Sequence, residues 1–330
     1  MNPNEFGLAE SGLKKSGFQR ARGPLAESEA EPQGIKKAEP RSIKKESELG
    51  KLWGLRKRPQ ALALRILVTL SAGVTIGIVL FLVGYILVKG VLHLSPDLFA
   101  WTYTSVNVSL LPALINTVLM TLLSLVFSVP LGVFAAVYLV EYARRGSRLV
   151  AAVRLAAETL AGIPSIVYGL FGMLLFVVHL KWGYSLLAGA CTLAVMVLPL
   201  VMRTAEESLL AIPDSYREGS FALGAGRLRT VFAVVLPSAV PGILAGVILA
   251  VGRIVGETAA LIFTAGTVAR LPESVCSSTR TLAVHMYSLA SEALYLNQSC
   301  ATAVVLLVLV SCINTLSIRA ARKLTGDRDG

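Results

Sequence analysis

Charged residues are scarce in this chain of 330 residues. They make up 15% of it, whereas apolar types reach 55% and the mean hydropathy is +0.69. An ordinary soluble domain is about 25% charged, so this composition argues against a soluble two-domain enzyme, the usual interpretation of such a length. The net charge of +11 does not indicate nucleic-acid binding either, because most basic residues lie between apolar runs. A multi-pass membrane protein remains.

Cysteine is scarce as well. The chain has four cysteines, none at Cys-x-x-Cys spacing, which is too few for a disulfide-stapled domain. Cys191 and Cys312 fall in apolar runs. In the expected topology Cys276 and Cys300 both fall on the outer side of the membrane, and they could form one disulfide if the outer compartment oxidises.

Motifs for catalysis are missing. There is no GxxxxGK[ST] to cradle a nucleotide phosphate, no GxSxG and no HExxH, and the three histidines are scattered. We therefore expect no catalytic residues, no metal and no cofactor in this chain. If the protein pumps a substrate, a partner must supply the energy.

Long apolar runs begin near residue 61. Six of them approach or exceed the roughly 20 residues that span a bilayer. Pro130 and Pro164 are expected to kink their helices. The sequence thus predicts an all-α, six-span domain over residues 61–323, with spans at about 64–88, 109–140, 155–179, 184–202, 238–266 and 298–318.

The two ends differ from this domain. Residues 1–60 hold 13 Lys and Arg and 8 Asp and Glu, so we expect a disordered, basic cytoplasmic tail. The tail lacks the early apolar run of a signal peptide. Residues 324–330 are expected to be a short C-terminal tail.

The charges between the runs predict the orientation. With the N-terminus in the cytoplasm, the inner segments carry 26 of the 31 Lys and Arg residues and the outer loops carry 4. Arg253, the remaining one, lies within the fifth run. This split follows the positive-inside rule. We expect both termini on the cytoplasmic side of the cell (inner) membrane.

The longest inner loop, residues 203–237, is predicted to fold into a compact knob. Ser215 and Glu218 fit a capping box that begins a short helix, and Gly224 can supply the left-handed residue that ends it. A second amphipathic stretch follows, and Pro237 is expected to open the fifth span. Capping and periodicity alone favour an ordinary structured loop.

The spacing of this loop resembles a known motif. Glu218, Gly224, Val234, Leu236 and Pro237 match the EAA loop of ABC-importer permeases at every position, with Gly219 and Ser220 in place of its two alanines. The resemblance implies that the loop is a coupling helix docked on an ATPase subunit. The contact residues that it implies are Asp214, Ser215, Glu218, Gly219, Ser220, Gly224, Leu236 and Pro237.

Further segments resemble one branch of these binding-protein-dependent inner membrane components (CysTW/EAA-loop permeases), the PstA family of phosphate-specific transport permeases. The resemblance covers roughly residues 62–323, and the 60-residue tail lies outside it. The segments are Asn116-Thr117, Tyr138–Ala143, Ala161–Gly172, Arg253–Ala265 and Leu282–Glu292.

The resemblance implies the type I ABC importer permease fold and a set of partners. These are a sister permease like PstC, two copies of an ATPase like PstB that bind ATP and Mg²⁺, an outer binding protein like PstS, and inorganic phosphate. It also implies alternating access: ATP binding closes the ATPase pair and pulls the knob at 213–232, and phosphate is released inward after hydrolysis.

The substrate pathway is expected around Arg253. A charge deep in a span costs about 2.5–3.5 kcal/mol, and Glu257, four residues on, would share its helical face. Such a pair marks a pathway or merely orients the helix. The planar fork of Arg suits phosphate oxygens. Further candidates are Arg203, Thr258, Asn116, Thr117 and Ser165, although an inner membrane anchor explains Arg203 better and interhelical hydrogen bonds explain the last three slightly better.

Two alternatives stay open on the residues alone. A permease of the same class could carry another oxyanion, such as sulfate or molybdate. An ion-coupled secondary transporter would need no ATPase, but it predicts several intramembrane carboxylates, and only Glu257 lies deep in a span.

Overall fold

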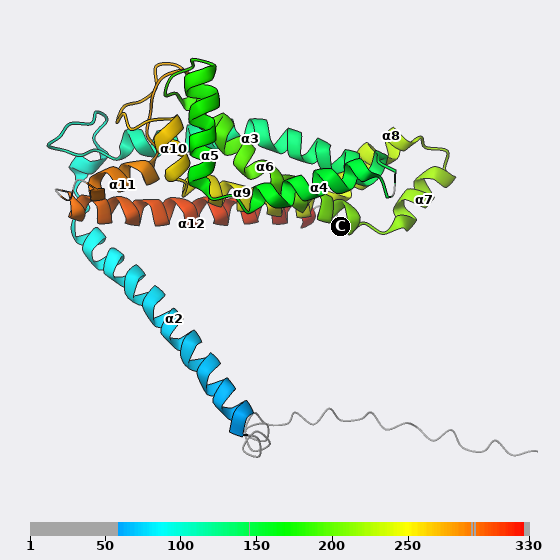
Figure 1. Ribbon diagram of the computed structural model, residues 1–330, viewed down its shortest axis with the longest axis horizontal. Coiled ribbons are helices and arrows are strands. Elements are labelled where there is room, and N and C mark those ends of the chain that lie inside the picture. Colours follow the sequence, from blue (N-terminus) through cyan, green and yellow to red (C-terminus); the bar gives the residue numbers. More distant parts are fainter. Residues whose placement is uncertain (1–58, 145, 292, 294, 327–330) are drawn as a thin grey trace, which may run out of the picture. The chain divides into compact units, whose positions relative to one another are not determined.

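The computed structural model describes residues 59–144, 146–291, 293 and 295–326. Over these residues the chain is helical and contains no β-strand (Figure 1). The expected N-terminal tail lies outside the described residues, except that Pro59 and Gln60 already belong to the first helix. At the other end, helix α12 continues to Gly326 through the first part of the expected C-terminal tail.

The chain divides into two units, residues 1–67 and 68–330. The described part of the first unit is the opening of helix α2, and the second unit holds the remaining helices. The main helices are α2 (Pro59–Leu92), α3 (Leu111–Val137), α4 (Arg148–Ala161), α5 (Ser165–Gly172), α6 (Leu186–Leu210), α7 (Asp214–Ala222), α8 (Arg227–Thr230), α9 (Leu236–Val255), α10 (Ala259–Thr264), α11 (Leu282–Ser291) and α12 (Leu296–Gly326). A short 3-10 helix, η1 (Pro96–Phe99), and three π-helical turns, η2 (Tyr138–Tyr142), η3 (Met173–His179) and η4 (Val231–Val235), complete the described elements.

Five of the described helices are long and apolar enough to cross a membrane, or six if one bent pair counts as a span. This agrees with the predicted six spans. The five unbroken spans are Ala63–Leu92, Leu111–Tyr142, Leu186–Leu210, Arg227–Val255 and Leu296–Arg319.

The third predicted run is bent rather than straight. Its first half is α4 and its second half is α5 with η3, and the helix axis bends by 103° between them. Gly162 ends α4 and Pro164 precedes α5, and a residue before proline is pushed out of the helical region. Pro130, by contrast, lies inside α3 without ending it. Of the two predicted kinks, the one at Pro164 is therefore a full break.

The fifth predicted run differs from the structure at both ends. Its helix begins at Arg227, because α8, η4 and α9 follow one another without a gap. Pro237 therefore lies inside a continuous helical stretch, and the coupling loop is shorter than the predicted 203–237. The helix also ends early, at Val255. Gly256, Glu257 and Thr258 separate it from the short helix α10.

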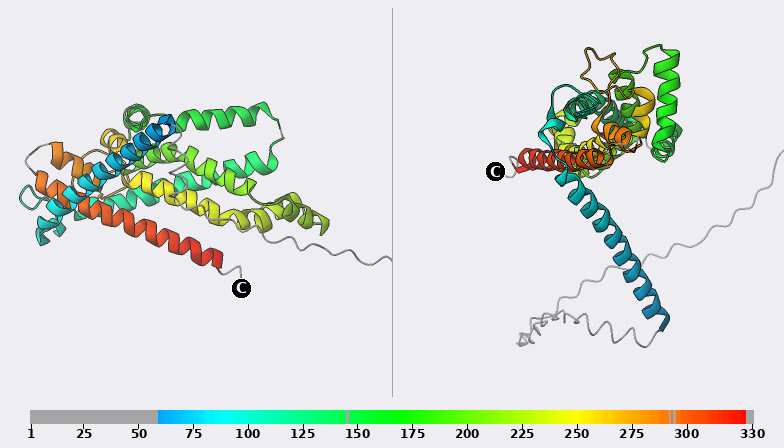
Figure 2. Two further views of the ribbon diagram at one scale, coloured as in Figure 1. Left: turned by 90° about the horizontal axis from the view of Figure 1, so that it is seen from below. Right: turned by 90° about the vertical axis from the view of Figure 1, so that its left-hand side faces the viewer.

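Helix α6 forms the centre of the second unit. It packs against α3, α9, α4, α5 and α10, and α3, α6 and α9 run side by side in Figures 1 and 2. Apolar side chains such as Leu193, Met196 and Val197 are completely buried there. The four cysteines are free thiols, so the disulfide considered for Cys276 and Cys300 is absent.

Close approach of α9 to α6 depends on glycine. A Cβ added to Gly246 would meet the Thr204 side chain, with 2.6 Å to its Cβ, and one added to Gly242 would meet Ser208. Thr204 has little freedom to move, because its hydroxyl hydrogen-bonds the carbonyls of Leu200 and Val201. Small residues at such contacts let two helix backbones pack closely in a membrane.

Gly246→Ala should therefore destabilise the protein, by about 1–3 kcal/mol for an overpacked contact. The apparent Tm in detergent is the measurement. Gly252→Ala, in the same helix, is the matched control, because nothing lies within 4 Å of its added Cβ. The control should be neutral or slightly stabilising. Equal Tm values for the two variants would contradict this account of the α6–α9 contact.

Candidate functional site: a charged cavity and an exposed helix

Helix α7 projects at one end of the second unit, beside α8 (Figure 1). It begins at Asp214, with Pro213 at the N-cap, and no side chain caps it. The predicted capping box of Ser215 and Glu218 is therefore wrong, because Ser215 lies within the first turn. Gly224 ends the helix with φ +80°, as predicted.

A buried arginine holds α7 to the rest of the bundle. Arg217 pairs with Glu141, the acidic residue of η2, at 2.8 Å between Nη2 and Oε1. The two side chains are only 15% and 8% exposed. Arg217 also donates to the carbonyls of Ile212 and Leu209, and to Asp214. One guanidinium thus joins α7, the end of α6 and the end of α3.

The rest of α7 and its turn are exposed. Glu218 and Gly219 lie open to the surroundings, and Leu223 is 91% exposed with Phe221 about half exposed. Ser220 differs from these, because its hydroxyl lies 2.9 Å from that of Thr230 and so ties α7 to α8. An exposed apolar and acidic surface on a firmly held short helix is suited to bind another protein.

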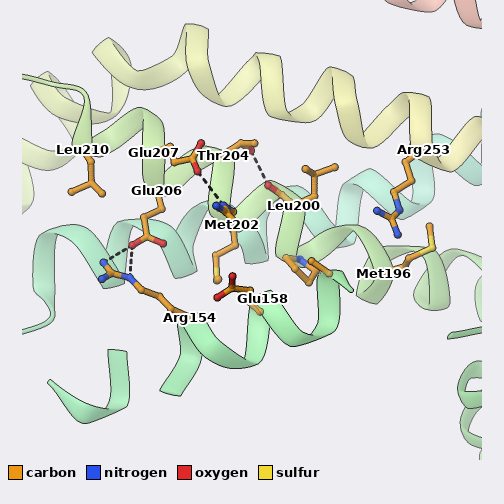
Figure 3. Close-up of a pocket in the computed structure, with 14 residues that line it drawn as sticks. Arg154, Glu158, Met196, Leu200, Met202, Thr204, Glu206, Glu207, Leu210 and Arg253 are labelled. Carbon is orange, nitrogen blue, oxygen red and sulfur yellow. Dashed lines mark hydrogen bonds and ion pairs between the residues drawn. The ribbon is translucent and has the colours of Figure 1, made fainter. Parts of the chain in front are cut away.

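A cavity of about 600 Å³ lies between α4, α6 and α9 (Figure 3). Figure 3 shows Arg154 and Glu206 facing each other at one end, Glu158 between, and Arg253 reaching in from α9 at the other end. The charged residues that line the cavity are Arg154, Arg203, Arg253, Glu158, Glu206 and Glu207.

Most of these charges are paired. Arg154 binds Glu206 at 2.7 Å between Nε and Oε1, and Arg203 pairs with Glu207 one helical turn away at 3.1 Å. Within the described part of the chain, no ion pair or hydrogen bond is formed by Arg253, whose side chain is exposed to the cavity. The cavity therefore presents one arginine that is free to bind an anion.

The predicted pair of Arg253 and Glu257 is wrong. The helix ends between them, and Glu257 turns to the next helix, where its Oε1 accepts a hydrogen bond from Ala260 N at 3.2 Å. Gly256 is the C-cap of α9, and glycine is a poor helix residue. The new helix α10 has Thr258 at its N-cap.

The structure separates the other predicted pathway residues. Arg203 shares the cavity with Arg253, whereas Thr258 lines a different pocket beside α11 and α12. Asn116 and Thr117 are both buried. Asn116 donates a hydrogen bond to the Arg280 carbonyl, just before α11, and Thr117 accepts one from Leu282 N at the start of α11. Ser165 starts α5 and is half-buried.

Sequence reasoning missed the paired residues. Glu206 and Glu207 follow Arg203 within one helical turn, which was a readable signal. The partners of Arg154 and Arg217 lie 52 and 76 residues away in the chain, and no spacing in one sequence connects such residues.

Comparisons with known proteins agree with this arrangement. Residues 128–325, which include the cavity and α7, match the family described as binding-protein-dependent transport system inner membrane component. A probable ABC transporter permease of Bacillus subtilis, YqgI, is 35% identical over 238 residues, which are 68% of this chain and 81% of that protein.

Several relatives, 35–41% identical to this chain, bear names that refer to phosphate. The phosphate transport system permease protein PstA of Haemophilus influenzae is 35% identical over 233 residues, 69% of this chain and 82% of that protein. PstA 1 of Mycobacterium tuberculosis is 40% identical over 154 residues, 47% of this chain and 50% of that protein.

Solved structures show the fold. A bacterial alginate ABC transporter aligns with a TM-score of 0.60 at 17% identity, over 83% of this chain and 98% of that chain. The inward-facing MetNI methionine ABC transporter aligns with a TM-score of 0.52 at 22% identity, over 65% and 94%. The chain thus has the type I ABC importer permease fold.

Arg217→Met should loosen α7 without disturbing the transmembrane bundle. Removing one partner of a buried ion pair costs about 3–5 kcal/mol, and this pair is the link between α7 and η2. Faster proteolysis or hydrogen exchange within residues 211–226 is the expected result. Arg229→Met, at an exposed position near α7, is the control. Equal protection in both variants would show that Arg217 is not the anchor.

Proposed function

Because the chain belongs to the family of binding-protein-dependent transport system inner membrane components, we propose that it carries inorganic phosphate across the membrane as one permease subunit of an ATP-driven importer. It is a multi-pass transport subunit rather than an enzyme. Proteins of this kind work with an ATPase and with a substrate-binding protein. ATP hydrolysis therefore takes place on a partner.

The identity of the substrate is supported by two observations. Relatives named as phosphate permeases are 35–41% identical to this chain. The cavity between α4, α6 and α9 offers Arg253 without an ion-pair partner, and the fork of a guanidinium binds phosphate oxygens two at a time. The cavity arginine carries this proposal.

The partners that we propose are specific. The sister permease resembles PstC, the two ATPase copies resemble PstB, and the outer binding protein resembles PstS. Both termini lie in the cytoplasm in this proposal, so that α7 faces the ATPase. The exposure of Glu218, Gly219 and Phe221 on α7 supports a docking role for this helix.

The proposed mechanism is alternating access. Closure of the ATPase pair on binding ATP would pull α7, and the Arg217–Glu141 ion pair would pass that movement to the end of α3. The cavity would then change from inward to outward access. Arg253 would hold phosphate during this change and release it inward after hydrolysis, since one unpaired arginine binds an anion without enclosing it.

Reconstitution of the complete importer tests the function. The chain, its sister permease, the ATPase and the binding protein are placed in liposomes, and ATP hydrolysis is measured with phosphate, sulfate and molybdate in turn. Stimulation by phosphate alone is expected. Stimulation by sulfate or molybdate instead would support the importer but exclude phosphate as its substrate.

Glu218→Lys reverses a charge on the exposed surface of α7. The variant should insert into the membrane normally but no longer bind the ATPase subunit.

Arg253→Gln should abolish phosphate uptake while the complex still assembles. The substitution removes the charge and the fork, and it breaks no ion pair among the described residues, so stability should not fall. Arg253→Lys should retain partial uptake, because it keeps the charge alone. Arg148→Gln, an exposed arginine of α4, is the control. Unchanged uptake in Arg253→Gln would show that Arg253 is outside the pathway.

A further inference from the structure

A second buried arginine lies at the opposite end of the bundle from α7. Figure 1 shows α10 and α11 at one end of the second unit and α7 and α8 at the other. The segment Thr279–Thr281 leads into α11 and packs against the first turns of α3. This segment does not line the cavity that contains Arg253.

The backbone of this segment is fixed by α3. Asn116 Nδ2 donates to the carbonyl oxygens of Arg270 and Arg280, at 3.0 and 3.3 Å. Thr117 Oγ1 accepts from Leu282 N at 2.8 Å. Two side chains of α3 thus hold Arg280 in place from both sides. The position of the arginine is therefore built into the fold.

The side chain of Arg280 is buried, and no counter-charge pairs with it within the part of the chain that the structure describes. Only 6% of the residue is exposed, and its guanidinium lies over the ring of Tyr103, 4.6 Å from the ring centre. Nε and Nη2 have no hydrogen-bond partner among the described residues. The acidic residue of the same loop, Glu273, is exposed and lies 3.9 Å from Arg270 instead. A buried charge of this kind is costly unless it is paired.

The unpaired atoms form one edge of the guanidinium. Nε–H and one Nη2–H point in the same direction, which is the geometry that binds two oxygens of a carboxylate or a tetrahedral oxyanion. The Tyr103 ring packs on a face of the guanidinium and not on this edge, whose atoms are buried. The orientation of Arg280 thus suits an anion with at least two oxygens.

Other unpaired polar groups surround Arg280. His285, on α11, is fully buried and meets the edge of the Tyr103 ring, with 6.0 Å between ring centres. Burial and the positive charge of Arg280 lower the pKa of His285 to about 3, although the backbone of Val108 acts in the opposite direction. The imidazole is therefore neutral and offers one donor and one acceptor. Further buried atoms without a partner in the described chain are Asn116 Oδ1, Thr279 Oγ1 and Thr281 Oγ1.

We propose that Arg280, His285 and the adjacent buried polar groups bind a tetrahedral oxyanion that carries a proton, at a second anion site separate from the Arg253 cavity. The guanidinium edge would bind two oxygens. The unpaired acceptors, His285 and Asn116, would accept from the protonated oxygen. Hydrogen phosphate has such a hydroxyl and sulfate does not, so the site selects phosphate over sulfate. Only the statement that this anion is also the transported substrate rests on the proposed function.

The test measures anion binding directly. The complex of the full chain with its sister permease and ATPase is purified in a neutral detergent with gluconate as the anion. Apparent Tm is then followed as inorganic phosphate, sulfate or chloride is added at constant ionic strength. A ligand that binds only the folded protein raises stability. Phosphate should raise the Tm of the wild type by about 2–4 °C for each kcal/mol of binding.

Variants assign the effect to Arg280. Both arms are made in the Arg253→Gln background, which silences the cavity site. There Arg280→Gln should abolish the Tm shift caused by phosphate, and in gluconate it should be at least as stable as its background, because it removes an uncompensated buried charge. Arg280→Lys should retain part of the shift. Arg270→Gln, an exposed arginine of the same loop, is the matched control and should respond as the wild type does.

Several results would overturn the inference. No shift with any anion would mean that water satisfies the cluster. A shift that persists when both Arg253 and Arg280 are replaced by Gln would place the anion elsewhere, for example on the ATPase. Equal shifts with chloride or sulfate would exclude recognition of a protonated oxyanion. Failure of phosphate to stimulate ATP hydrolysis would overturn the proposed function but leave an Arg280-dependent shift intact.

Discussion

A charged guanidinium that packs within a helix bundle is stabilised by an acceptor, and the arginines of the second unit differ in whether they have one. Arg217 finds Glu141 and two carbonyls, and Arg154 finds Glu206. These two arginines join helices that are distant in the chain, and their role is structural. Arg253 and Arg280 have no such partner among the described residues. Arg217 and Arg280 are largely buried, whereas Arg154 is half exposed and Arg253 is open to its cavity. The two arginines without a partner are those that we propose to bind an anion.

Helix α3 connects the two ends at which these arginines act. Its first turns hold the segment before α11 through Asn116 and Thr117, and the π-turn that follows it holds α7 through Glu141. Between these points α3 packs along the central helix α6. A displacement of α7 would therefore be transmitted along a helix that also positions Arg280. A π-turn at the α7 end fits this role, because such turns are common at functional sites.

Much of the fold could be predicted from the sequence, because hydropathy and loop charge act locally. The spans emerged from apolar runs, the break at Pro164 from the restriction before proline, and the end of α7 from Gly224. The pairing of Arg217 with Glu141 could not be predicted, since the two residues lie 76 positions apart. The pairing of Arg253 with Glu257 was predicted wrongly because both residues were placed on one continuous fifth helix. Apolarity continues through Gly256 although the helix does not, and periodicity cannot detect such a break.

The broken third and fifth runs complement each other. The short helix α10 packs against α5, where Gly169 lets the backbone of Ala260 approach so closely that an added Cβ would lie 2.8 Å from its Cα. Non-helical backbone at membrane depth is tolerated only where protein buries it or where it lines a cavity. The break at Gly256–Thr258 begins just after Arg253, which lines the cavity between α4, α6 and α9. The end of α9 therefore places Arg253 in the last helical turn before this break and beside the cavity.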